Sequence, residues 1–269
     1  MSALQGKSMN AELLDSLPLW ALCLATIAVG FVSVEAGYRL GRLRRLRSEA
    51  EKESSVGVMV AATLGLLAFT LAFTFGLAWG RFDARRQLVL DEANAIRTSY
   101  LRSAFLPEPQ RSTIRDLLRE YLEARLEAAR PDRAQQAVVA SQRLHARLWG
   151  EAVAAGEKEP SSVLNGLFIA SLNEVIGLHV KRVQAALRSR VPGVIWAILY
   201  FVASLAMVGI GYHEGLSSLR RSPAVAAVVL TFSAVLFLIA DLERPQEGLL
   251  EVSQQAMVDL RNSLDETSP

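Results

Sequence analysis

Four long apolar runs dominate the pattern of hydrophobic and polar positions along the chain. They cover residues 17–34, 56–79, 191–212 and 224–240, and the second run holds no charged residue. About 20 apolar residues in a helix cross a bilayer, and local thinning accommodates a shorter run. The pattern therefore predicts four membrane-spanning helices, called spans one to four here. Four buried helices of a soluble bundle are the disfavoured alternative, because charge-free runs of this length are rare in soluble cores.

The first run has the features of a retained span rather than a cleaved signal peptide. It is longer than the apolar core of a signal peptide, and Lys7 is the only basic residue before it.

Two prolines lie at positions that fit the starts of predicted helices. Pro192 lies in the first turn of span three and Pro223 precedes span four, and a helix tolerates proline at these positions.

Helical periodicity continues outside the four runs. Phe82, Val89 and Ile96 recur every seven residues, so span two is predicted to continue as one helix to about residue 104, before Pro107. Further helices are predicted at about 112–130, at 132–156 and from Pro160 to span three, with Ser161 or Ser162 as the cap of the last. Two of these helices carry apolar stripes, formed by Ile114, Leu117, Leu118, Tyr121, Leu122 and Leu126, and by Leu164, Phe168, Leu172, Val175, His179, Val183 and Leu187.

The remaining tail and the absence of strand patterns complete the predicted fold. A short helix is expected in the tail 241–269, where Leu250, Met257, Leu260 and Leu264 are spaced helically. No segment alternates between apolar and polar residues. The expected fold class is therefore all-α: a four-span helical membrane protein with a helical extramembrane bundle, residues 80–190, inserted between spans two and three.

Composition and missing motifs exclude several function classes. Of the 269 residues, 51% are hydrophobic and 21% charged, with a net charge of +2, which excludes a disordered chain. Cys23 is the only cysteine, so no disulfide framework or zinc finger is expected. Phosphate loops, zinc-protease helices and nucleophile elbows are absent, so we expect no enzyme, cofactor or metal. Nucleic acid is not expected as a partner, because acids balance the basic residues.

The charges of the short loops suggest an orientation. The loop 35–55 is rich in arginine and the loop 213–222 holds Arg220 and Arg221, whereas the N-terminal tail holds only Lys7. Basic residues in short loops favour the cytoplasmic side, which would place residues 80–190 and both termini outside. Residues 80–190 are themselves basic, however, so the orientation remains open.

Span two carries the most informative pattern. One helical stripe consists of small residues, a second of threonines, and two phenylalanines lie one turn apart. Small residues allow close approach of helices in lipid, while hydroxyls and phenyl rings can line a pore and narrow it. The alternative is ordinary helix packing, with each threonine bonded to its own helix. The packing candidates are Ala61, Gly65, Ala68, Ala72, Gly76 and Gly80, and the pore-lining candidates are Thr63, Thr70, Thr74, Phe69 and Phe73.

Ionisable groups are nearly absent from the four runs, which argues against a proton-coupled or ion-coupled transporter. Glu35, at the end of span one, is interpreted as an interfacial residue paired with a nearby arginine rather than as a gate. His145, His179 and His213 fall in different elements without the spacing of metal ligands. His179 lies on an apolar stripe, where the expected role is that of a packing residue with its hydrogen bonds satisfied.

The segment 81–96 that follows span two is dense in polar residues. Arg85 and Glu92 are seven residues apart and share a helix face. Arginine–carboxylate bonds could lock this helix to its neighbours. The simpler interpretation of the segment alone is a solvated face with extended arginines.

Several motifs resemble a bacterial family of unknown function that is labelled bestrophin-like. The resemblance extends in order over nearly the whole chain and rests on residues 71–75, 81–89, 91–96, 100–102, 118–121, 178–183, 191–192, 241–248 and 252–253. It marks a polar cluster of Arg85, Arg86, Glu92, Asn94, Tyr100 and Arg244. The sequence departs from the family pattern at Arg97, where glycine is expected, and at Gln246, where an aromatic residue is expected.

The resemblance implies expectations about function. Bestrophins are oligomeric anion channels with four spans, a pore lined by the second span and a hydrophobic neck, for which Phe69 and Phe73 are candidates. The acidic calcium clasp of animal bestrophins has no counterpart here, so calcium gating is not implied. In bestrophins the large helical region is cytoplasmic, which conflicts with the orientation suggested by the loops.

Two hypotheses follow for this multi-pass protein of the bacterial plasma membrane. In the first, it is a bestrophin-like homo-oligomeric ion channel in the lipid bilayer, with span two lining the path of an inorganic ion and Arg85, Arg86 and Glu92 ordering its mouth. In the second, it is a non-conducting membrane scaffold or sensor whose helical bundle binds a partner protein.

Overall fold

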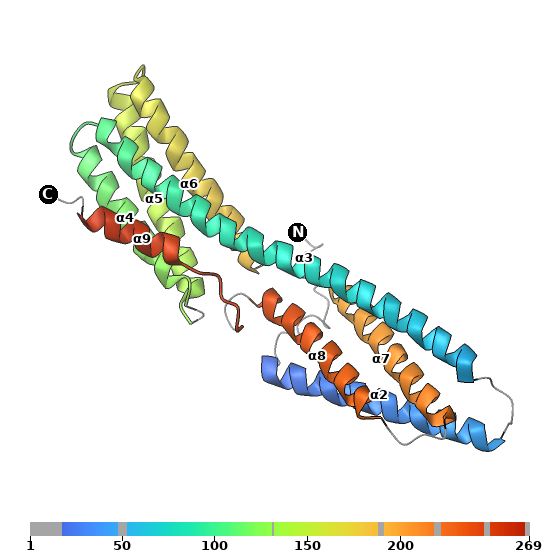
Figure 1. Ribbon diagram of the computed structural model, residues 1–269. Helices are drawn as coiled ribbons and strands as arrows, with labels where there is room; N and C mark the ends of the chain where they lie inside the picture. The colour runs from blue at the N-terminus through green and yellow to red at the C-terminus, as the bar shows by residue number, and fades with distance from the viewer. Residues whose placement is uncertain are drawn as a thin grey trace, which may run out of the picture. The chain divides into compact units, whose positions relative to one another are not determined.

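The computed structural model describes residues 18–47, 53–130, 132–187, 191–217, 222–244 and 248–266. Within these ranges all regular structure is helical, which confirms the predicted all-helical fold. The chain forms two compact units. The first contains Met1–Gly80 and Arg190–Arg244, and the second contains Arg81–Ser189 and Pro245–Pro269. The helix α3 (Glu53–Arg102) belongs to both units, because it continues without interruption from one into the other (Figure 1).

The first unit contains α2 (Leu19–Arg47), the first half of α3, α7 (Gly193–Leu216) and α8 (Pro223–Glu243). The helix α2 packs along both α7 and α8. Large apolar side chains point outward, including Trp20, Val32 and Phe201, which are 67%, 68% and 68% exposed. A soluble unit rarely exposes so much contiguous apolar surface, whereas lipid is a suitable solvent for it.

Five helices of the described chain are long and apolar enough to cross a membrane. Four of them correspond to the predicted runs. The fifth, Val163–Ala186, is α6 of the second unit.

The helices of the first unit are longer than the apolar runs. Residues 35–47, which the sequence assigned to a loop, continue α2, and α7 continues through His213 to Leu216. Polar side chains do not end a helix whose backbone bonds are already satisfied. Within this extension Arg39 pairs with Glu35 one turn earlier, with 2.8 Å between Nε and Oε1, which confirms the predicted pairing of Glu35 with a nearby arginine.

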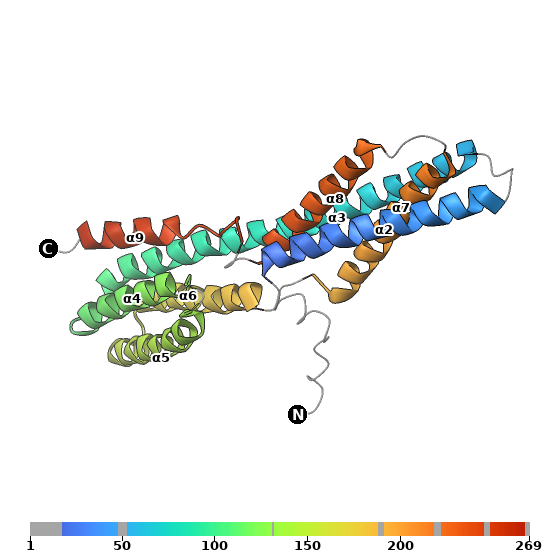
Figure 2. The same cartoon turned by 90° about the horizontal axis from the view of Figure 1, so that it is seen from below.

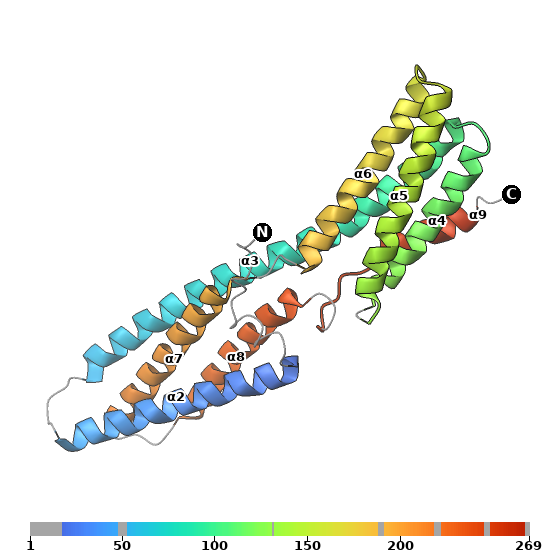
Figure 3. The same cartoon turned by 180° about the vertical axis from the view of Figure 1, so that it is seen from behind.

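The second unit is a helical bundle (Figures 2 and 3). It contains the second half of α3, the short 3₁₀ helix Ser103–Phe105, α4 (Gln110–Glu127), α5 (Ala134–Lys158), α6 (Val163–Leu187) and α9 (Gln255–Glu266). Its core includes five of the six predicted stripe residues of α4, while Leu126 packs at the edge. On α6, Phe168, Leu172 and Val175 are fully buried. Leu164, in the first turn of α6, lies on the same stripe but is 46% exposed.

Local capping follows the predicted chemistry at the start of α6. The Ser162 hydroxyl accepts a hydrogen bond from the Asn165 amide at 3.3 Å, which is the geometry of a helix N-cap. The side chain of Leu187 lies outside the described residues.

Candidate functional site

The closest helix contact of the first unit is a reciprocal pair of glycine motifs on α2 and α7. A Cβ added at Gly37 would lie 2.0 Å from the carbonyl oxygen of Val208, and one added at Gly211 would lie 2.0 Å from that of Val34. Gly41 and Gly215 repeat the arrangement one turn further, each 2.3 Å from a tyrosine carbonyl oxygen. Sequence reasoning missed this contact, although Gly37-x-x-x-Gly41 and Gly211-x-x-x-Gly215 are both small-xxx-small motifs.

The threonines of α3 face the packed side of the helix or its flank. Leu67, Leu71, Thr74 and Ala78 form the buried stripe of α3, and Thr63 and Thr70 are half-buried beside it. Each of the three threonine hydroxyls donates to the carbonyl oxygen four residues earlier, at 2.9 Å for Thr63 and 2.8 Å for Thr70 and Thr74. Their hydrogen-bonding capacity is therefore already used within the helix, as ordinary packing would require.

The small residues and the phenylalanines of α3 are exposed. Phe69 and Phe73 are 70% and 63% exposed, and a Cβ added at Gly65, Gly76 or Gly80 would meet no atom of the described chain within 4 Å. All six predicted packing residues are exposed: Ala61, Gly65, Ala68, Ala72, Gly76 and Gly80. They do not pack within this chain, so any close approach that they permit would involve another molecule.

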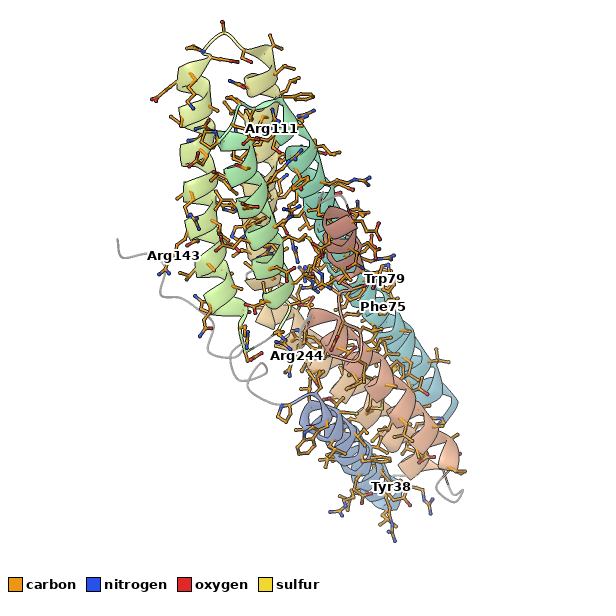
Figure 4. All side chains as sticks on the ribbon, turned by 90° about the vertical axis from the view of Figure 1, so that its left-hand side faces the viewer. Tyr38, Phe75, Trp79, Arg111, Arg143 and Arg244 are labelled. Carbon is orange, nitrogen blue, oxygen red and sulfur yellow. The ribbon has the colours of Figure 1, made fainter. Side chains whose placement is uncertain are left out.

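The predicted pore-lining residues occupy two different faces of α3. A helix turns by about 100° per residue, which places the phenylalanines about 100° from the threonines and about 160° from the buried stripe. The axis of a pore lined by α3 would therefore face either the phenylalanines or the threonines, but not both sets. Phe75 and Trp79, labelled in Figure 4, stack on the same helix with ring centroids 6.4 Å apart.

In the second unit a buried carboxylate holds three helices together. Glu92 of α3 is fully buried and lies 3.2 Å from the Nε of Arg125 on α4. Nη1 of Arg182 on α6 and the hydroxyl of Tyr121 on α4 also donate to Glu92. The second amino group of Arg182 donates to Gln254, at 3.2 Å, just before α9. We call Glu92, Tyr121, Arg125 and Arg182 the Glu92 cluster.

The electrostatics of the Glu92 cluster favour one charge state. Burial raises the pKa of Glu92, but the positive charges of Arg125 and Arg182 outweigh it and leave that pKa below its ordinary value. Burial and the neighbouring carboxylate both raise the pKa of Tyr121 well above its ordinary value, so Tyr121 stays protonated and donates to Glu92. At neutral pH the cluster therefore contains one negative and two positive charges.

Two histidines lie beside this cluster. The ring centroids of His145 and His179 are 4.8 Å apart, and His145 is also 4.8 Å from the Tyr121 ring. Burial lowers the pKa of each histidine to about 4, and the positive charge of Arg125 contributes in the same direction. Nε2 of His145 and both ring nitrogens of His179 are buried without a hydrogen-bond partner in the described chain. His179 is 3% exposed, as the expected packing role requires, but no residue of the described chain satisfies its ring nitrogens.

The predicted polar cluster is only partly assembled. Arg85 and Glu92 are buried in the second unit, which overturns the interpretation of a fully solvated face. Tyr100 is also buried and accepts a bond from Arg119 at 2.8 Å. Arg86 and Asn94 are exposed, and Arg244, labelled in Figure 4, is a buried residue of the first unit.

Metal binding has no support in this arrangement. Within the described residues, no group of three or more histidine, cysteine, aspartate or glutamate side chains could hold a metal ion. His145 and His179 meet edge to face, as packed aromatic rings do.

The chain is similar to a known protein family and to solved structures. A family model described as a Bestrophin-like domain matches residues 26–257. A crystal structure of a bacterial bestrophin homologue from Klebsiella pneumoniae has a TM-score of 0.64 at 16% identity, covering 91% of this chain and 97% of that chain. Another structure of this homologue, phased with zinc, has a TM-score of 0.63 at 15% identity, covering 92% and 98%. No curated protein matches the sequence.

The structural similarity at this low identity shows a shared fold, and the family match covers most of the chain. Both agree with the motifs found in the sequence and with the several apolar helices of the structure. The chain therefore belongs to the Bestrophin-like family and is a multi-pass membrane protein.

Proposed function

We propose that the protein is a homo-oligomeric ion channel with four spans, in which the first half of α3 from each subunit surrounds a central path. Phe69 and Phe73 form the hydrophobic neck of this path, and the small residues of the same face allow the α3 helices of neighbouring subunits to approach closely. The single observation that carries the proposal is the exposed glycine–phenylalanine face of α3, which has space beside its glycines and lies opposite the packed stripe.

A lipid-facing role explains this face less well. Large aliphatic residues cover the lipid-facing surfaces of membrane helices, whereas glycine and alanine are enriched where helices meet. The helices α2 and α7 follow this rule, because both expose large residues and place their glycines against neighbouring helices. By the same rule, the glycines of α3 belong to a contact that a second subunit supplies.

Four spans, rather than five, fit the chemistry of α6. This helix packs on α5, which packs on α4, and α4 carries eight charged residues among its 18. Such a helix cannot lie in hydrocarbon, so its partners in the bundle lie outside the membrane with it. The apolar residues of α6 are explained by the core of the second unit, where Phe168, Leu172 and Val175 are fully buried.

The Glu92 cluster would support the channel from a distance. Because α3 is one continuous helix, the bundle that holds its second half also holds the helix whose first half would line the path. The cluster fixes the rotation of α3 within the bundle, since Glu92 bonds to both α4 and α6. Arg86 is exposed, and in this proposal it keeps the role predicted from the sequence, which is to order the mouth of the ion path.

Conductance of the purified protein in liposomes tests the proposal. We expect Phe73→Ala to change the unitary conductance or the open probability, because it widens the neck. Phe201→Ala on α7 is the matched control, since it removes an equally exposed aromatic ring from a different helix and should leave conduction unchanged. A folded, reconstituted protein that conducts no ion, or equal effects of the two substitutions, would contradict the proposal.

Cysteine cross-linking tests the assembly separately. Cys23 is the only native cysteine, so Phe73→Cys in a Cys23→Ser background introduces one reactive group. We expect oxidation in membranes to link subunits through Phe73→Cys but not through Phe201→Cys. An absence of linking through Phe73→Cys would contradict the contact between α3 helices, and equal linking at both positions would show that the linking is not specific to α3.

A further inference from the structure

The second unit contains a cavity of about 400 Å³ that the proposed channel does not use. Its walls come from the second half of α3, the end of α4, the start of α5, the end of α6 and the segment before α9. Sites for small molecules commonly have volumes of about 300–1,000 Å³ and mostly apolar walls with a few polar groups. The cavity has the size and the walls of such a site.

Positive charge dominates the polar part of the cavity wall. Arg85, Arg125, Arg130 and Arg182 line it, whereas Glu251 is the only acidic residue that does. Arg85 and Arg125 are buried, and the side chain of Arg182 is 11% exposed. Two of these buried charges, on Arg125 and Arg182, face the single negative charge of Glu92. Buried charge without full compensation is costly, so the cavity favours an anion.

The guanidinium group of Arg125 retains capacity for a ligand. The hydrogen bond and the ion pair of Arg125 within the described chain both use Nε and both go to Glu92. Its two terminal amino groups therefore remain available for an anion. Arg182 and Gln254, which are joined at 3.2 Å, lie on the same wall. Guanidinium groups bind carboxylates with good geometry and charge-assisted hydrogen bonds.

Most of the remaining cavity wall is aliphatic, although Gln135 and Ser253 also line it. Leu88 and Val89 of α3, Val138 of α5 and Val183 of α6 line it together with five alanines of the adjoining segments. Side chains of this kind gain by contact with an apolar body and offer no hydrogen bonds to a polar one. An inorganic anion alone would satisfy the arginines but leave these walls without a partner.

We propose that this cavity binds a small amphipathic organic acid, with its carboxylate at Arg125 and Arg182 and its aliphatic body against Val138 and Val183. Arg125 and Arg182 also bind Glu92. A bound carboxylate would therefore add a second negative charge beside Glu92, where α3, α4 and α6 meet. This inference concerns binding alone and does not depend on ion conduction.

Calorimetric titration of octanoate into the protein in lipid nanodiscs, with empty nanodiscs subtracted, tests the inference. We expect saturable binding of octanoate and binding of neutral octanamide and of inorganic phosphate that is weaker by about tenfold or more. Val138→Trp should weaken octanoate binding by about tenfold or more, because it fills the cavity. Val139→Trp is the matched control, since Val139 is 41% exposed and does not line the cavity.

A second variant guards against misfolding of Val138→Trp. Arg130→Gln removes a charge at the exposed rim without touching the Glu92 cluster, and we expect it to weaken octanoate binding by roughly threefold. Octanoate binding that is absent, that is equal in the wild type and both cavity variants, or that octanamide matches would overturn the proposal. Phosphate binding as tight as that of octanoate would overturn the role of the aliphatic walls.

Discussion

The substitution Glu92→Gln tests whether the buried charges of the second unit stabilise its helix arrangement. Glutamine keeps the shape of the side chain but removes the negative charge. Arg125 and Arg182 then face each other's charge with only a neutral amide between them. Tyr121 keeps an acceptor, so the main loss is electrostatic.

An exposed ion pair of the same length provides a reference for the expected loss of stability. Glu92 and Arg125 are 3.2 Å apart with side chains 0% and 4% exposed, whereas Glu120 and Arg147 are also 3.2 Å apart with side chains 59% and 61% exposed. Removing one partner from a buried pair costs about 3–5 kcal/mol, because the other charge stays buried. Removing one partner from an exposed pair costs about 0–1 kcal/mol. The distance is the same, so the two expectations differ because Glu92 is buried and also holds Arg182 and Tyr121.

Hydrogen exchange of the detergent-solubilised protein measures the difference. Exchange of protected amides in α4 and α6 reports the free energy of local opening. We expect Glu92→Gln to accelerate it on the order of 10²–10⁴-fold, and Glu120→Gln by less than about fivefold. If the two substitutions accelerate exchange equally, the Glu92 cluster does not stabilise the bundle and the reasoning from burial is wrong.

Two further predictions concern other parts of the structure. The pKa of His145 and that of His179 are lowered to about 4 from 6.5, so the unfolded chain takes up protons first as pH falls. The free energy of unfolding should therefore fall between pH 6.5 and 4, by at most about 3 kcal/mol per histidine, and His145→Gln should flatten this slope in denaturation curves. Gly211→Ala should lower the stability of the protein in detergent by about 1–3 kcal/mol, because the new Cβ meets the backbone of Val34, whereas Gly65→Ala should leave thermal unfolding of the subunit nearly unchanged.

The all-helical fold could be predicted because it depends on local patterns. A stripe such as Ile114, Leu117 and Leu118 needs only helical spacing to indicate a buried face, and these residues are buried. Helix ends were harder to place. An apolar run indicates which residues suit lipid, but it does not indicate where the helix ends. The helix α2 continues to Arg47, because its backbone hydrogen bonds and the Glu35–Arg39 pair stabilise it beyond the last apolar residue.

The glycine contact between α2 and α7 was missed for a different reason. Small-xxx-small spacing occurs on α2, α3 and α7 alike, and the spacing alone does not say which motif meets a partner within the chain. The structure separates them: added Cβ atoms collide at Gly37 and Gly211 but have open space at Gly76 and Gly80. The sequence-based prediction named the glycines of α3, which have open space beside them in the described chain, and passed over those that form the intrachain contact.

The Glu92 cluster shows how a single sequence can hide a buried charge network. Its members are distant in the chain. Glu92 pairs with Arg125 and with Arg182, which lie on other helices, so the periodicity of a single helix does not reveal either pair. A signal was nevertheless present. Arg125 lies four residues after Tyr121 on the apolar stripe of α4, and Arg182 lies three residues after His179 on α6. A cation at a core position of an amphipathic helix requires a buried anion, and Glu92, which shares a helix face with Arg85, was the acid that satisfied it.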